Sequence, residues 1–322
     1  MNNFKKVGLT ALAGSLIATS AFAGSMSVTG GADISLANSS NYTDGNSFSS
    51  GDSLNFSGSG ELDNGMVVTS NVEIDGGTYD DRSVVIEMPE AGTLKFQQSG
   101  DTAMSAVDDV MPTAYDASWD VIGHTATSTS KTAGQADKEG AIGGFSTGNN
   151  FFYTAPTMID GLGVNVSYTP SGGSTRPDGS ISFALAYTGV EGLTVGYAED
   201  DNGRKGTNKI ETNTMYAKYA FGSFTVGMQT SEQDAAASAS DDDFAAHGIT
   251  YQVTDDLTIG YHASEREFGD KSADQETKGI SAAYTMGGMT LKAQSVSMDN
   301  VGGSTASRDD VDGYKLSVSF AF

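Results

Sequence analysis

The chain ends on Tyr314-Lys-Leu-Ser-Val-Ser-Phe-Ala-Phe322, a stretch in which apolar residues alternate without a break with polar or small ones. A repeat of two residues places successive side chains on opposite faces of a β-strand. The stretch therefore predicts a strand with one apolar face and one polar face. Two kinds of fold use such a strand: a β-barrel that crosses a membrane, and the edge of a secreted β-sandwich.

The same alternation recurs along most of the chain, in about sixteen segments of strand length. Leu257, Ile259 and Tyr261 belong to one such segment. Short turns such as Asn64-Gly65, which is typical of a type I′ hairpin, alternate with longer polar connections such as 75–81 and 265–276. An even number of strands, with short turns at one end and long loops at the other, predicts an all-β, 16-stranded antiparallel transmembrane β-barrel.

One segment breaks this pattern. Residues Gly100–Asn149 contain no good alternating run, and they hold the only tryptophan, Trp119. A connection this long without regular structure is uncommon in a compact fold and is usually functional. The segment is also too polar to face lipid, where unsatisfied backbone groups are costly. We therefore expect it to fold into the barrel and to narrow the channel.

The first residues, Met1–Ala23, have the three parts of a secretory signal. Lys5 and Lys6 give a positive start, an apolar stretch follows, and Ala21-Phe22-Ala23 is an A-x-A cleavage site. We predict a signal peptide over residues 1–23 and a mature barrel over residues 24–322. Because the chain has no cysteine, no disulfide supports this fold.

The chain is strongly acidic, with 17 Lys and Arg residues against 41 Asp and Glu residues. Without Lys5 and Lys6, the 15 remaining basic residues give the mature chain a net charge of about −26. Such a charge excludes nucleic acid as a natural partner, because repulsion would replace counterion release. It is compatible with an acidic aqueous channel or with acidic surface loops.

The signal, the closing Phe322, the strand pattern and the long segment after the fifth strand together resemble the trimeric general-diffusion porins of Gram-negative bacteria. In length and low arginine content the chain is most similar to the alphaproteobacterial (Rhodobacter-type) porins. The resemblance implies an outer-membrane channel for the passive diffusion of small hydrophilic solutes and ions, without enzyme activity. It also implies a homotrimer in contact with outer-membrane lipid and lipopolysaccharide. The third loop, residues 100–149, would form the constriction, and the barrel-assembly machinery would read Phe322 as the insertion signal.

In that family, acidic residues of the third loop face basic residues of the wall across the constriction. The matching acidic residues here are Asp101, Asp108, Asp109, Asp116 and Asp120. The matching basic residues are Lys95, Lys218, Lys292 and Lys315, for which a place elsewhere in the lumen is the alternative. Strand parity directs five further residues into the lumen: Asp33, Glu61, Glu73, Glu87 and His262. Wall arginines are nearly absent, which departs from the family pattern. The net negative charge predicts a modest preference for cations.

The sequence contains no arrangement that is typical of an enzyme. Histidine occurs only at His124, His247 and His262, and H-E-x-x-H, a P-loop and G-x-S-x-G are absent. Acidic clusters such as Asp241-Asp242-Asp243 offer the oxygen ligands that Ca²⁺ prefers, but they match no calcium motif. We therefore expect no metal site and no cofactor, with Ca²⁺ at the acidic loops as the alternative. An adhesin or structural barrel with a plugged lumen, and a soluble secreted β-protein, are the competing functions.

Overall fold

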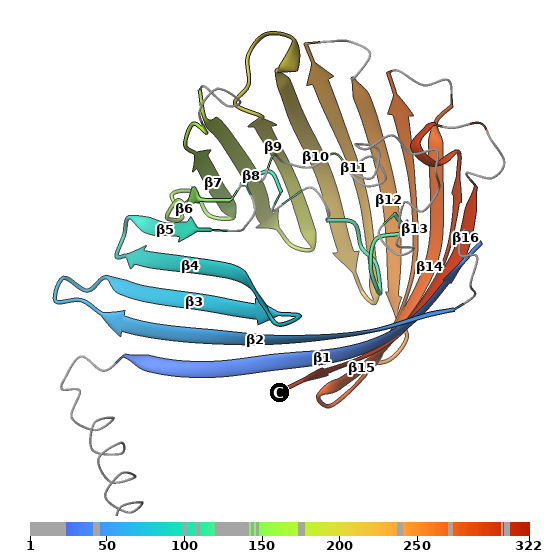
Figure 1. The fold of residues 1–322 in the computed structure, drawn as a ribbon, viewed down its shortest axis with the longest axis horizontal. Helices are drawn as coiled ribbons and strands as arrows, with labels where there is room; N and C mark the ends of the chain where they lie inside the picture. Colours follow the sequence, from blue (N-terminus) through green and yellow to red (C-terminus); the bar gives the residue numbers. More distant parts are fainter. Residues whose placement is uncertain are drawn as a thin grey trace, which may run out of the picture.

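The computed structural model describes residues 24–40, 46–98, 102–105, 107, 110–119, 142, 145, 148–172, 178–236, 241–269, 273–303, 305 and 310–322. Within these residues the chain forms sixteen β-strands. Each strand pairs with its neighbours in the sequence, and β1 pairs antiparallel with β16, so that the sheet closes into a barrel (Figure 1). The predicted 16-stranded antiparallel barrel is confirmed. The predicted signal peptide, residues 1–23, lies outside the described residues.

The bounds of the strands follow the chain in order. They are β1 (Ser25–Ser39), β2 (Ser47–Glu61), β3 (Val67–Asp75), β4 (Thr78–Met88), β5 (Gly92–Gln97), β6 (Asn150–Thr154), β7 (Leu162–Thr169), β8 (Ser180–Val190), β9 (Leu193–Asp201), β10 (Ile210–Phe221), β11 (Phe224–Ala235), β12 (Asp242–Gln252), β13 (Leu257–Phe268), β14 (Gln275–Met286), β15 (Met289–Asp299) and β16 (Val311–Ala321). Two short 3-10 turns, η3 (Gly206–Asn208) and η5 (Val301–Gly303), lie between strands. In the described part of the chain, no helix has the length and apolar character needed to cross a membrane.

Side chains alternate along each strand between the lumen and the outer face. In β12, Asp242 and Phe244 are buried on the lumen face, whereas Asp243 between them is exposed. The outer face carries the large apolar side chains: Ile280 is 62% exposed and Leu316 is 44% exposed. A continuous apolar surface of this kind requires an apolar environment, and an outward apolar band is what strands present to lipid.

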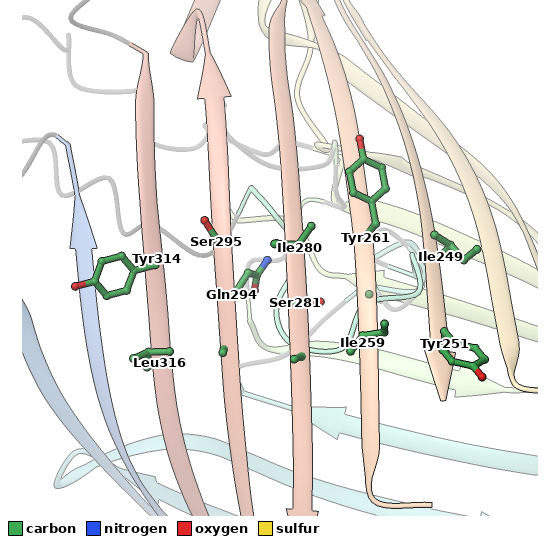
Figure 2. A pocket seen from close by; sticks show the side chains of 13 residues that line it. Ile249, Tyr251, Ile259, Tyr261, Ile280, Ser281, Gln294, Ser295, Tyr314 and Leu316 are labelled. Carbon is green, nitrogen blue, oxygen red and sulfur yellow. The ribbon is translucent and has the colours of Figure 1, made fainter. Parts of the chain in front are cut away.

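Figure 2 shows part of this outer face over β12–β16. Tyr261, Ile280 and Tyr314 project from three of these strands and help to line an apolar pocket of about 720 Å³. At the ends of β11 and β12, the rings of Phe224 and Tyr251 pack with their centroids 4.6 Å apart. Aromatic rings at strand ends, at the level of the lipid headgroups, are typical of transmembrane barrels.

The strands extend beyond the apolar alternation in the sequence. β13 continues to Phe268, although the sequence predicts a loop from Glu265, and β2 already begins at Ser47, within the polar segment that precedes Leu54. In both places the backbone ladder continues through polar residues, because a strand can project past the apolar band of its outer face. Apolar alternation therefore underestimates strand length at the loop end of the barrel.

The connection between β3 and β4 differs from its prediction. The sequence predicts a loop over 75–81, but Gly76 and Gly77 join the strands in a two-residue turn, with φ of 54° and 79°. Two successive residues at positive φ form the type I′ turn that was predicted for Asn64-Gly65. At Asn64-Gly65 itself only Gly65 has a positive φ, 78°, so the predicted type I′ turn does not form there. The Gly65 N–H donates to the Leu62 carbonyl at 2.9 Å. The strict alternation of short and long connections is therefore wrong at β3–β4.

The most buried apolar cluster lies inside the barrel, between the wall and the segment that joins β5 to β6. This segment is the third loop, which was predicted over residues 100–149 and spans residues 98–149 between the two strands; Figure 1 shows its described parts inside the ring of strands. Loop residues of the cluster include Met104, Met111 and Trp119, and wall residues include Phe244 and Met298. The described part of the third loop therefore packs against the lumen face of the wall.

Candidate functional site

The third loop is first attached to β7 and β8 through its backbone. The Ala103 N–H donates to Ser167 Oγ at 2.9 Å, and the Met104 N–H donates to Ser182 Oγ at 2.8 Å. Ala103 and Met104 are both 0% exposed. Small hydroxyl side chains on the lumen face therefore satisfy loop N–H groups that would otherwise be buried without a partner.

A buried carboxylate on β9 joins the two ends of the third loop. Asp200, which is 3% exposed, accepts hydrogen bonds through Oδ2 from Thr102 Oγ1 at 2.9 Å and from the Phe145 N–H at 2.7 Å. Its Oδ1 accepts from Ser180 Oγ at 3.2 Å. Because Thr102 lies near the start of the loop and Phe145 near its end, this one side chain holds both ends against the same part of the wall.

The tip of the described loop segment is attached to β12 and β13 around His262. The Ser118 N–H donates to His262 Nδ1 at 3.2 Å, and Ser118 Oγ lies 2.6 Å from the same nitrogen. Since the N–H is a donor, Nδ1 acts as an acceptor and the imidazole is neutral with its proton on Nε2. The Trp119 ring packs on His262 and on Phe244, with centroid distances of 4.5 Å and 5.0 Å.

Charged side chains meet where the loop approaches β15, β16 and β1. Lys315 Nζ donates to Asp116 Oδ2 at 3.1 Å. Lys292 and Lys315 place their ammonium groups 5.2 Å and 5.3 Å from the centre of the Tyr115 ring. These residues and Asp33 line a pocket of about 470 Å³ in the lumen, whose remaining lining consists of small residues, among them Ser35, Ser49, Gly51, Ser317 and Ser319.

The structure brings together four of the residues that the sequence predicts at the constriction or in the lumen. Asp116, Lys292, Lys315 and Asp33 line one pocket. The other acidic residues predicted at the constriction lie outside the described residues; they are Asp101, Asp108, Asp109 and Asp120.

The remaining predicted residues lie away from this pocket. Lys95 on β5 and Lys218 on β10 are half-buried and are not among its lining residues. His262 points inward but is 1% exposed beneath Ser118 and Trp119, so that it supports the loop rather than contacting the open lumen. The three acidic residues Glu61, Glu73 and Glu87 share lumen parity on β2, β3 and β4 and also lie outside the lining of this pocket.

Phe322 completes the closure of the barrel beside β1. Its N–H donates to the Gly30 carbonyl at 3.0 Å, and the Gly30 N–H donates to the Phe322 carbonyl at 2.7 Å. The ring is 73% exposed on the outside.

For Ca²⁺, the described residues offer one group of carboxylates within 4.8 Å of one another, Glu265, Glu267 and Asp274, all exposed. Calcium at the acidic loops stays the alternative to the prediction of no metal.

Sequence reasoning missed Tyr115 and Arg266. Arg266 on β13 forms an ion pair with Asp242 on β12 at 2.9 Å, and their side chains are 5% and 0% exposed. Extending the period of two from His262 through Ser264 would have placed Arg266 on the lumen face. No comparable signal identifies Tyr115, because the third loop has no periodicity that relates it to the wall.

Comparison with known proteins places the fold in a family. A family model described as Gram-negative porin matches residues 8–322. No curated protein matches the chain. Among solved structures, the chain is similar to OmpT, an outer membrane protein of Vibrio cholerae, with 13% sequence identity, a TM-score of 0.66, and coverage of 94% of this chain and 99% of that chain.

Two solved porins have the same fold. The anion-selective porin from Comamonas acidovorans has 14% identity, a TM-score of 0.68, and coverage of 92% of this chain and 99% of that chain. A mutant of the Rh. blastica porin has 17% identity, a TM-score of 0.63, and coverage of 92% of this chain and 100% of that chain. Because the family model spans nearly the whole chain and the barrel agrees with it, the chain belongs to the Gram-negative porin family and is a multi-pass β-barrel of the outer membrane.

Proposed function

We propose that the chain forms a water-filled channel for the passive diffusion of small hydrophilic solutes and ions, and that it is not an enzyme. One observation carries this proposal: a polar pocket in the lumen is bounded on one side by Tyr115 and Asp116 of the third loop and on the other by Ser35 and Ser49 of the wall. The described part of the loop contacts strands from β7 to β16, and the lumen face of β1 and β2 is rich in serine.

We propose that the channel prefers cations modestly. Within the pocket the charges balance, since Asp33 and Asp116 accompany Lys292 and Lys315. The preference then comes from the net charge of about −26 of the mature chain, which has 15 basic and 41 acidic residues, and from acidic lumen residues such as Glu73. It should be small, because charges in a wide aqueous channel are screened within about 8 Å at physiological salt.

Planar-bilayer recordings test both proposals. Single-channel conductance should be ohmic and large, and the reversal potential in a KCl gradient should have the sign of cation preference. Lys292→Gln and Lys315→Gln should each strengthen that preference, whereas Asp33→Asn should weaken it. Lys278→Gln is the matched control, because it removes the same charge from an exposed outer-face position. An anion-selective channel would contradict the cation preference, and a protein that inserts but does not conduct would support the plugged barrel instead.

The predicted acidic side of the constriction is part of the same proposal. We place Asp101, Asp108, Asp109 and Asp120 with Asp116 near the narrowest point. Replacing Asp108, Asp109, Asp116 and Asp120 together by asparagine should move the reversal potential toward zero, and an unchanged potential would show that these side chains do not face the ion path.

We further propose that the mature chain begins at Gly24 and that three copies assemble in contact with lipopolysaccharide. N-terminal sequencing of protein from outer membranes tests the first point. Chemical cross-linking in outer membranes, followed by electrophoresis of unheated and heated samples, tests the second. If cross-linking gives only a single chain and no larger species, the trimer is ruled out.

A further inference from the structure

Four consecutive strands carry a glycine on the lumen face directly beneath the third loop. They are Gly227 on β11, Gly248 on β12, Gly260 on β13 and Gly279 on β14, and we call them the glycine track. In the ladder, Gly227 pairs with Gly248, Gly248 pairs with His262, and His262 pairs with Gly279. The track therefore crosses the wall beside the histidine to which the loop is attached.

The loop backbone occupies the space that side chains of the track would need. A Cβ atom added at Gly227 would lie 2.6 Å from Pro112 Cδ, and one added at Gly248 would lie 2.6 Å from the Pro112 carbonyl oxygen. Real Cβ atoms essentially never approach other heavy atoms closer than 3.0 Å. Any residue other than glycine at these positions would therefore displace Pro112.

The other two positions of the track are almost as close to the loop. A Cβ atom at Gly279 would lie 2.9 Å from Ser118 Cβ. One at Gly260 would lie 3.1 Å from the Ala114 nitrogen and 2.9 Å from Ser281 Oγ, which itself accepts a hydrogen bond from that nitrogen. The track thus supports the loop from Pro112 to Ser118.

Backbone conformation does not explain these glycines. None of the four has a positive φ, and the ladder registers through β11–β14 are regular. Glycine inside a strand weakens the strand, and it often marks a place where another backbone approaches closely. Gly163 offers a contrast, since it lies on β7 and a Cβ atom added there would meet its nearest neighbour, the Ala186 carbonyl oxygen, at 3.8 Å.

We propose that the glycine track sets the width of the channel, because the absence of side chains lets the third loop lie directly against the backbone of the wall. The four glycines are therefore positioning residues for the size of solute that passes. A methyl group at Gly248 would have to increase its distance to the Pro112 oxygen from 2.6 Å to at least 3.4 Å, the start of ordinary contact. The wall is held by ladders on both sides, so the loop moves, and the lumen is the side on which it has room. The inference rests on the proposed channel function.

The test measures single-channel conductance and the size of polyethylene glycol that is excluded from the channel. Gly248→Ala should lower both, Gly248→Val should lower them further, and Gly163→Ala should leave them unchanged. Unheated gel electrophoresis checks that each variant forms a folded barrel. Folded Gly248 variants with the conductance and exclusion size of the wild type would overturn the proposal.

A second pair of variants keeps the proposal testable if the Gly248 variants do not assemble. The obstacle to a Cβ atom at Gly227 is Pro112 Cδ, an atom that alanine lacks. Gly227→Ala should therefore narrow the channel, and adding Pro112→Ala should restore it toward the width measured for Pro112→Ala alone. Absence of this recovery in folded double variants would refute the steric explanation. If the wild type itself does not conduct, the proposed function fails rather than the role of the track.

Discussion

Replacing His262 with alanine should loosen the third loop and make the channel current fluctuate. His262 is 1% exposed, and its side chain contacts both Ser118 and Trp119. The variant removes the acceptor for the Ser118 N–H and the ring on which the indole packs. It leaves the hydrogen bonds of Asp200 in place, so the loop should make excursions from the wall rather than leave it.

The size of the effect follows from the contacts that are lost. Two hydrogen bonds contribute about 1 kcal/mol each, and an aromatic contact adds about 0.5–1.5 kcal/mol. The free energy that favours the docked over the undocked state of the segment around Ser118 should thus fall by about 3 kcal/mol. Since each 1.4 kcal/mol corresponds to about a tenfold change in an equilibrium constant, the undocked population should rise about 100-fold.

Single-channel recording measures this change as transitions between current levels, or as extra noise in the open channel. His262→Gln is an informative second variant, because its amide oxygen can accept from the Ser118 N–H and should restore part of the quiet behaviour. His247→Ala is the matched control, since His247 is an exposed residue on the adjacent strand. A His262→Ala channel as quiet as the wild type, in protein that is folded, would refute the attachment of the loop through His262.

Three further outcomes are expected. Arg266→Ala should lower the temperature at which the folded band disappears in gel electrophoresis, because it leaves the buried, 0% exposed carboxylate of Asp242 without its ion-pair partner. The expected loss of stability is about 3–5 kcal/mol, and replacing both residues with apolar ones should restore much of that stability. Deleting Phe322 should reduce outer-membrane assembly and leave export across the inner membrane intact, and normal amounts of folded protein in outer-membrane fractions would contradict this. Proteases added to intact cells should cut in the connection between β11 and β12, within Glu232–Asp243, and cleavage at Gly287-Gly288 would contradict the predicted orientation.

The wall of the barrel was predictable from sequence because a period of two determines which face each side chain occupies. Lys292 and Lys315 could be placed in the lumen for that reason, and their strands are neighbours in the barrel. Extending the same parity through polar residues would also have found Arg266. The apolar residues end earlier than the strand does, and that is why β13 was predicted to be shorter than it is.

The third loop could be recognised from sequence, but its contacts could not be predicted. Ser118 and His262 are separated by 144 residues, and no local pattern connects them. Among the acidic residues predicted at the constriction, only the path of the loop decides which of them approaches a lysine, and among the described residues it is Asp116 that does so. The glycine track is equally hidden, since its members become neighbours only when the register of four strands is known.

The third loop has an apolar core that is separate from the forces that hold the barrel. The barrel closes through backbone ladders between neighbouring strands, and its apolar outer face is stabilised by lipid. The buried apolar cluster, by contrast, lies between the loop and the lumen face of the wall, so that its burial holds the loop in place. This separation explains how four successive strands tolerate a lumen-facing glycine, although each costs a strand about 0.5–1 kcal/mol relative to alanine. The ladders on either side keep the wall intact, and the position of the loop can be adjusted by residues that contribute little to the stability of the barrel.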